Sequence, residues 1–114
     1  MREVIEELLK PIILDENITF VGIYRIDGVP IYVHFKNRQL LSLIDWLEDQ
    51  VKVLINYIAS GYFKDAEFKM RDSHLFLIPI SKTLVLGVLA LEDASMYKLR
   101  VDLESIKNEF EKHA

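Results

Sequence analysis

Few side chains in this sequence have the types and spacing that chemistry requires. The 114 residues include no cysteine, which excludes disulfides, thiol catalysis and thiolate metal ligands. The chain has no HExxH or GxSxG motif, and its four glycines are isolated, so it has no glycine-rich loop for a phosphate. The pattern is that of a protein without an enzyme active site, and we expect no cofactor and no metal site.

Three histidines and one pair of carboxylates are the remaining candidates. His34, His74 and His113 fall in a predicted strand, at a turn and at the C-terminal end, where structural or solvated roles are favoured over catalysis. Asp45 and Asp49 lie one turn apart in a predicted helix. A solvated helix face explains this pair, and the alternative is a surface that docks a partner or binds a cation. Neither group indicates a reaction.

Length, composition and charge narrow the class of protein. The chain is 51% hydrophobic and 28% charged, which suits one folded domain over residues 1–114. Its net charge of −4 and lack of a long basic run make nucleic acid an unexpected partner. No apolar run approaches the roughly 20 residues of a membrane helix, so no membrane insertion is expected. The charged N-terminus does not resemble a secretory signal, so we expect a cytoplasmic protein.

Apolar patterns predict five strands. The stretch GIYRIDGVPIYVHF, residues 22–35, places Asp27 and Gly28 between two apolar runs, and Asp-Gly is a strong hairpin signal. The runs HLFLIPIS and TLVLGVLAL are almost continuously apolar, as strands covered on both faces are. Charged and apolar residues alternate in KDAEFKMR, which is typical of an edge strand. The predicted strands are residues 18–26, 29–35, 64–71, 74–81 and 83–91.

Three helices complete the predicted order of elements. The first covers residues 2–10 and is ended or kinked by Pro11, the second covers 38–60, and the third begins at 93 or 95 and runs to 112. The order helix–strand–strand–helix–strand–strand–strand–helix predicts an α/β (α+β) sandwich with a five-stranded, mostly antiparallel sheet. We expect the long second helix on one face of this sheet and the two terminal helices on the other.

The helix at 38–60 is apolar around at least half its circumference, which is more than one sheet face requires. Trp46 and Tyr57 lie beside an already complete aliphatic stripe. They pack either on loops of the same domain or at a protein interface, where such aromatic residues are common anchors. Glu48 and Lys52 have the spacing of an i,i+4 ion pair. The second apolar stripe is Leu43, Trp46, Gln50, Val53 and Tyr57, and the polar arc is Asp45, Glu48, Asp49, Lys52 and Asn56.

The strand at 64–71 has a charge pattern that suits pairing with its own copy. If two copies run antiparallel about a two-fold axis at Phe68, all four charged pairs are opposite in sign, whereas an axis at Glu67 or Lys69 would place like charges together. The alternative is that the charges only protect an edge strand from aggregation. The facing pairs about Phe68 are Asp65 with Arg71, Ala66 with Met70, and Glu67 with Lys69.

With these elements in place, the chain resembles a roadblock/dynein light chain domain, most closely in the style of a prokaryotic member. The residues that carry the resemblance are GIYRIDGVPIYVHF, the long helix after it, FKMRD, LFLIPIS and TLVLGVLALEDASMYKLR. The sequence departs from the family pattern near its N-terminal end, where Pro11 and the residues ILDEN lengthen the link between the first helix and the first strand. The resemblance implies a dimer in which the third strands of two sheets join and the second helices lie side by side. It also implies a scaffold or regulator of small Ras-like GTPases, or a dynein adaptor.

The leading hypothesis is therefore a non-enzymatic homodimeric regulator or scaffold of a small Ras-like GTPase, docked on the paired second helices. Two alternatives stay open: a sensory domain of the profilin-like or PAS type that binds a small ligand, and a structural adaptor without a GTPase partner. The expected dimer interface is residues 65–71 with the second apolar stripe of the helix. The expected docking residues are Asp45, Asp49, Lys52 and Asn56.

Overall fold

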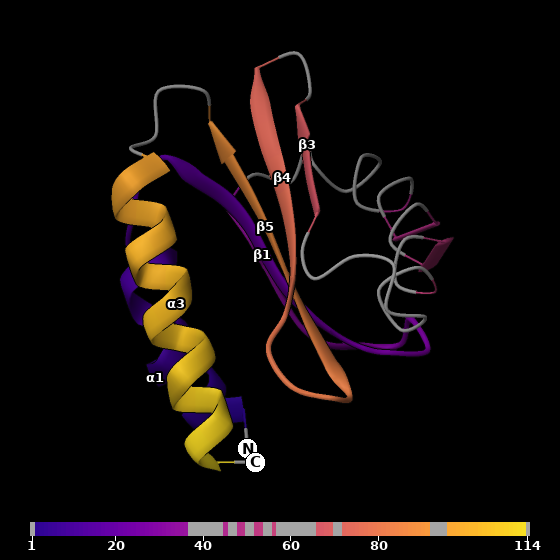
Figure 1. Ribbon diagram of the computed structural model, residues 1–114. Coiled ribbons are helices and arrows are strands. Elements are labelled where there is room, and N and C mark those ends of the chain that lie inside the picture. The colour runs from indigo at the N-terminus through magenta and orange to yellow at the C-terminus, as the bar shows by residue number, and fades with distance from the viewer. Residues whose placement is uncertain are drawn as a thin grey trace.

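The computed structural model describes residues 2–36, 45, 48–49, 52–53, 56, 66–69, 72–91 and 96–113. Its strands form one five-stranded antiparallel sheet in the order β2-β1-β5-β4-β3, and α1 and α3 lie side by side on one face of it (Figure 1). The predicted α+β class and antiparallel sheet are confirmed. The elements are α1 (Arg2–Ile13), β1 (Ile18–Arg25), β2 (Pro30–Phe35), β3 (Ala66–Lys69), β4 (Ser73–Pro79), β5 (Leu84–Leu91) and α3 (Met96–His113).

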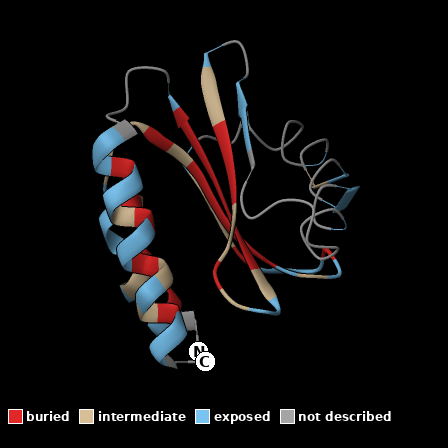
Figure 2. Cartoon of the chain, viewed as in Figure 1, coloured by how far each residue is buried: buried red, intermediate tan, exposed pale blue. Residues whose placement is uncertain are grey.

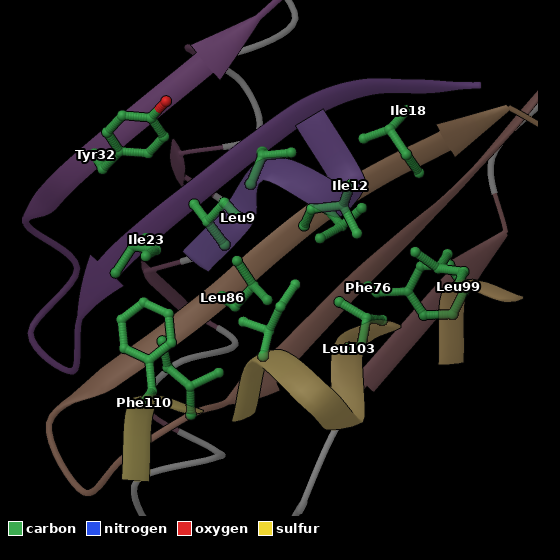
Figure 3. Packing of buried hydrophobic residues seen from close by; sticks show 14 of the residues in the cluster. Leu9, Ile12, Ile18, Ile23, Tyr32, Phe76, Leu86, Leu99, Leu103 and Phe110 are labelled. Atoms are coloured by element: carbon green, nitrogen blue, oxygen red, sulfur yellow. The ribbon is translucent and has the colours of Figure 1, made fainter. Parts of the chain in front are cut away.

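Apolar stripes on the two helices build the core against the sheet. Figure 2 shows the buried residues of α1 and α3 turned toward the strands, and Figure 3 shows their side chains meeting those of β1, β4 and β5. In α3 the i, i+4, i+7 spacing of Leu99, Leu103 and Ile106 brings these apolar residues to one face of the helix. The helix residues of this core are Ile5, Leu9, Ile12, Leu99, Leu103, Ile106 and Phe110.

The predicted end of the first helix at Pro11 was wrong, whereas the strand predicted from His74 is confirmed. α1 does not end at Pro11 but continues to Ile13, with Pro11 exposed on its outer face. Proline already has a helical φ, and the next turn buries Ile12 almost completely, so apolar burial outweighs the lost backbone hydrogen bond. His74 is the first residue of the strand predicted over 74–81 and lies within β4, with its ring stacked on Phe76.

The β1–β2 hairpin turns at Asp27 and Gly28, as predicted. Gly28 has a φ of 90°, a conformation that residues with a side chain rarely adopt. β2 then begins at Pro30, where an edge strand tolerates the missing N–H. The register of β1 against β2 shifts between Ile23 and Tyr24, which marks a β-bulge beside this proline.

The second face of the sheet, opposite α1 and α3, is built around two facing glycines. Gly22 of β1 pairs with Gly87 of β5 at the centre of the sheet. A Cβ added to Gly22 would lie 2.8 Å from the ring of Tyr24 and 2.9 Å from that of Phe20. The glycines therefore leave room for two buried aromatic rings that cover the strands.

The helix predicted at 38–60 is described at positions 45, 48, 49, 52, 53 and 56, and all six are helical. The other positions of that prediction lie outside the described residues. Within the part of the chain that the structure describes, no helix has the length and apolar character needed to cross a membrane.

Candidate functional site

Strand β3 forms one edge of the sheet and pairs with β4 alone among the described strands. Glu67 and Lys69 are exposed, and they lie opposite Phe76 and His74 on the side of the sheet that carries α3. Phe68 points to the other face and is 36% exposed. The edge therefore has two charged side chains on one face and an aromatic ring on the other.

Two further residues of the predicted dimer interface are described, Val53 and Ala66. Of the helix stripe, Val53 alone is described, and its side chain is 55% exposed. Ala66 is described by its position in β3, where it pairs with Leu77. The remaining predicted interface residues lie outside the described residues: Leu43, Trp46, Gln50, Tyr57, Asp65, Met70 and Arg71.

The four predicted docking residues do share one helix face. Asp45, Asp49, Lys52 and Asn56 are all helical and exposed. At about 100° per residue, their spacing places them within an arc of roughly 60°. We call these four residues the polar helix face.

Lys52 connects this face to the β1–β2 turn, and sequence reasoning missed the contact. A Cβ built on Gly28 would meet Lys52 Cγ at 2.6 Å and its Cβ and Cδ at 3.5 Å. The aliphatic stem of Lys52 therefore lies against the turn where Gly28 has no side chain. No local signal predicts this contact, because the two residues are 24 positions apart in the sequence.

The ion pair predicted between Glu48 and Lys52 is wrong. Both residues are described, and the salt bridges of the described residues do not join them. The stem of Lys52 is directed to Gly28 instead, while Glu48 is close enough to Tyr24 to act on its hydroxyl electrostatically. The contact between the Lys52 stem and the turn thus takes the place of a weak local pair worth only a few tenths of a kcal/mol.

Tyr24 is the most perturbed titratable group that the structure describes. Its side chain is 1% exposed, and its hydroxyl has no hydrogen-bond partner. Burial raises the pKa of this phenol well above its usual value, and the nearby Glu48 carboxylate raises it further. The hydroxyl is thus buried and held in its neutral form at ordinary pH.

The β1–β2 turn is held by its own hydrogen bonds although it is exposed. Asp27 Oδ1 accepts from the backbone N–H of Val29 at 3.2 Å and from Arg25 Nε at 3.1 Å. Backbone bonds of 2.8 Å run from Gly28 to Arg25 and from Arg25 to Val29. The hydrogen bond from Arg25 lowers the pKa of Asp27. These bonds fix the turn that supports Lys52.

The described residues include no group of three or more histidine, aspartate and glutamate side chains placed to hold a metal ion. What they bring together is a charged sheet edge, and a polar helix face next to a fixed hairpin turn. Exposed charged and polar side chains lie on both surfaces.

The arrangement of the helices and the strand order define the class of protein, which is the Roadblock/LC7 fold. A Roadblock/LC7 domain from Streptomyces avermitilis matches with a TM-score of 0.73 and 13% identity over 95% of each chain. MglB from Myxococcus xanthus matches with a TM-score of 0.69 and 16% identity, over 93% of this chain and 87% of that one. The gliding protein MglB from Thermus thermophilus matches with a TM-score of 0.65 and 14% identity, over 99% of this chain and 89% of that one.

Within that fold, the model of the AF0774-like protein family matches residues 2–104, and the chain belongs to this family. A comparison with curated proteins found no match.

Proposed function

We propose that this protein is a non-enzymatic homodimeric scaffold or regulator of a small Ras-like GTPase. The observation that carries the proposal is the edge strand β3, where Glu67 and Lys69 alternate around Phe68 on a Roadblock/LC7 fold. The resemblance of the sequence to the roadblock family implies a dimeric scaffold of such GTPases, and the chain has the fold of that family.

The proposed dimer joins β3 to its own copy, antiparallel about Phe68. Each Glu67 then faces Lys69 of the mate, and the two Phe68 rings meet at the axis. Opposite charges across strands contribute about 0.2–1 kcal/mol for each pair, so this register is favoured over its neighbours. The other facing pairs are Asp65 with Arg71 and Ala66 with Met70.

The helix stripe extends the same interface. Lys52 contacts the hairpin next to edge strand β2, and Val53 lies about 100° further around the helix, away from that contact. Val53 is exposed in the single chain, which supports its burial against the second helix of the mate. The proposed helix contacts are Leu43, Trp46, Gln50, Val53 and Tyr57.

The GTPase is proposed to dock on the paired second helices, with the polar helix face of each protomer on or beside that surface. Asp45, Asp49, Lys52 and Asn56 are exposed together on one arc of the helix, as a docking face requires. A small-ligand sensory domain is less favoured, because the rings of Phe20 and Tyr24 occupy the space above the central glycines.

Charge reversal at the edge tests the dimer. Glu67→Lys and Lys69→Glu should each weaken dimerisation by about 1 kcal/mol or more, since each change creates two like-charge contacts. The double variant restores opposite charges and should recover most of the loss in a double-mutant cycle on the dissociation constant. Harmless single changes, or losses that simply add, would place the interface elsewhere.

Light scattering and direct binding test the rest. The protein at micromolar concentration should have about twice its chain mass of 13.3 kDa. Each small Ras-like GTPase of the source genome, loaded with GDP or a non-hydrolysable GTP analogue, should be titrated against it. Binding of one nucleotide state in preference indicates regulation, and equal binding indicates scaffolding. A folded monomer, or no binding by any of these GTPases, would refute the proposal.

A further inference from the structure

We propose that Lys52 is a specificity-determining cation of the docking surface, held in place by the β1–β2 turn and paired with a carboxylate of the bound GTPase. This inference rests on the proposed function. It adds the chemistry of one contact and makes the hairpin turn, residues 26–29, part of the docking surface.

The stem of Lys52 lies against the β1–β2 turn. Its Cβ, Cγ and Cδ all lie within 3.5 Å of the point where Gly28 would carry a side chain. The turn itself is fixed by the bonds between Arg25, Asp27 and Val29. A lysine on an ordinary helix surface loses much rotamer freedom on binding, whereas this one has already lost part of it.

The head of Lys52 remains available to a partner. Glu48 is one turn away and close to Tyr24, and Asp49 is three positions away, yet Lys52 makes no ion pair with any residue that the structure describes. On the turn, Asp27 is occupied by Arg25. The side chain thus has a constrained stem and an exposed ammonium, which is an arrangement suited to a directed charge-assisted contact.

The surroundings indicate what the partner presents. Lys52 is the cation of the polar helix face, and Asp45 and Asp49 flank it with negative charge. Val29, on the adjoining turn, is an exposed apolar residue. A complementary partner surface has a carboxylate opposite Lys52, donor groups opposite the two aspartates, and an apolar side chain against Val29. A partner without that carboxylate would leave the Lys52 ammonium desolvated and unpaired in the interface, and would bind more weakly.

Lys52→Met is the sharpest test, because methionine keeps an unbranched stem against Gly28 and removes the charge. The GTPase found to bind the wild type should bind this variant about tenfold more weakly, the effect of losing one charge-assisted contact. Lys52→Glu should bind more weakly still, and Lys52→Arg should retain most of the affinity. Raising the salt concentration should weaken the wild type more than Lys52→Met. The matched control is Lys82→Met, on the exposed β4–β5 turn.

Melting temperature and dimer mass, measured on every variant, separate this contact from a structural role. Unchanged stability with weaker binding supports the inference. Wild-type affinity in Lys52→Met would refute it, and the proposed function would stand. Binding lost equally in Lys82→Met would also refute it, since the effect would then be one of net charge. A wild type that binds no GTPase refutes the proposed function, and with it this inference.

Discussion

Gly28→Ala should be unusually destabilising for a change at an exposed turn. The φ of 90° at this position is unfavourable for any residue with a Cβ, at a cost of about 1–2 kcal/mol. The new Cβ would also lie 2.6 Å from Lys52 Cγ, where real Cβ atoms essentially never approach. Such overpacking costs about 1–3 kcal/mol, because the stem of Lys52 must leave its position against the turn or the turn must shift. The free energy of unfolding should therefore fall by about 2–5 kcal/mol.

A double-mutant cycle separates the two causes. Lys52→Ala removes Cγ and leaves Cβ, which lies at an ordinary contact distance of 3.5 Å from the added methyl group. The variant Gly28→Ala/Lys52→Ala should thus keep the backbone strain and lose the collision. We expect it to be more stable than Gly28→Ala alone by about 1–3 kcal/mol, although Lys52→Ala by itself removes a favourable contact.

Urea unfolding at one fixed protein concentration measures these differences, because self-association makes apparent stability depend on concentration. Lys82→Ala serves as the control for removing an exposed lysine stem, and it should not rescue Gly28→Ala. If the two changes at Gly28 and Lys52 destabilise additively, the lysine stem does not lie on the turn in solution. The reasoning that makes the turn part of the docking surface would then fail.

Four further predictions concern the sheet and the turn. Gly22→Ala should lower the free energy of unfolding by about 1–3 kcal/mol, because its Cβ would meet the rings of Phe20 and Tyr24; denaturant unfolding measures this. Tyr24→Phe should leave stability unchanged or raise it, because it removes a buried hydroxyl without a partner. Because the pKa of Tyr24 is raised in the folded state, the contribution of this phenol to the free energy of unfolding is present below pH 10, its ordinary pKa, and is lost as the pH rises above it. Ultraviolet titration of the folded protein should show one phenol that resists ionisation. The pKa of Asp27 is lowered in the folded state, so the contribution of this carboxylate to the free energy of unfolding is present above pH 3.8, its ordinary pKa, and is lost at lower pH. The stability difference between the wild type and Asp27→Asn should therefore shrink on acidification.

Local rules were enough to predict most of the architecture. Asp27 and Gly28 fixed the hairpin because so few residues adopt positive φ, and the continuous apolar runs of β4 and β5 identified strands covered on both faces. The α3 stripe followed from helical spacing. In each case the deciding interaction lies within a few residues in the sequence, or depends only on which residues must leave water.

The errors have the opposite origin. Pro11 was expected to end or kink α1, and the helix continues past it to Ile13, where it buries Ile12 against the sheet. Glu48 and Lys52 were expected to pair, and the stem of Lys52 lies against the hairpin turn instead. These outcomes depend on which segments the fold brings together. A local preference of a few tenths of a kcal/mol cannot compete with such contacts.

The candidate docking surface was only half predictable for the same reason. Asp45, Asp49, Lys52 and Asn56 share a helix face by spacing alone, so their common exposure follows from the sequence. What spacing cannot show is that one of the four is anchored, because the anchor is a glycine on a distant hairpin. A position without a side chain gives no sequence signal of what fills its space. Gly28 has two roles here: it allows the turn, and it leaves the space in which Lys52 is held. A hairpin glycine required for both roles should resist substitution more strongly than φ alone explains, and the cycle with Lys52 measures that excess.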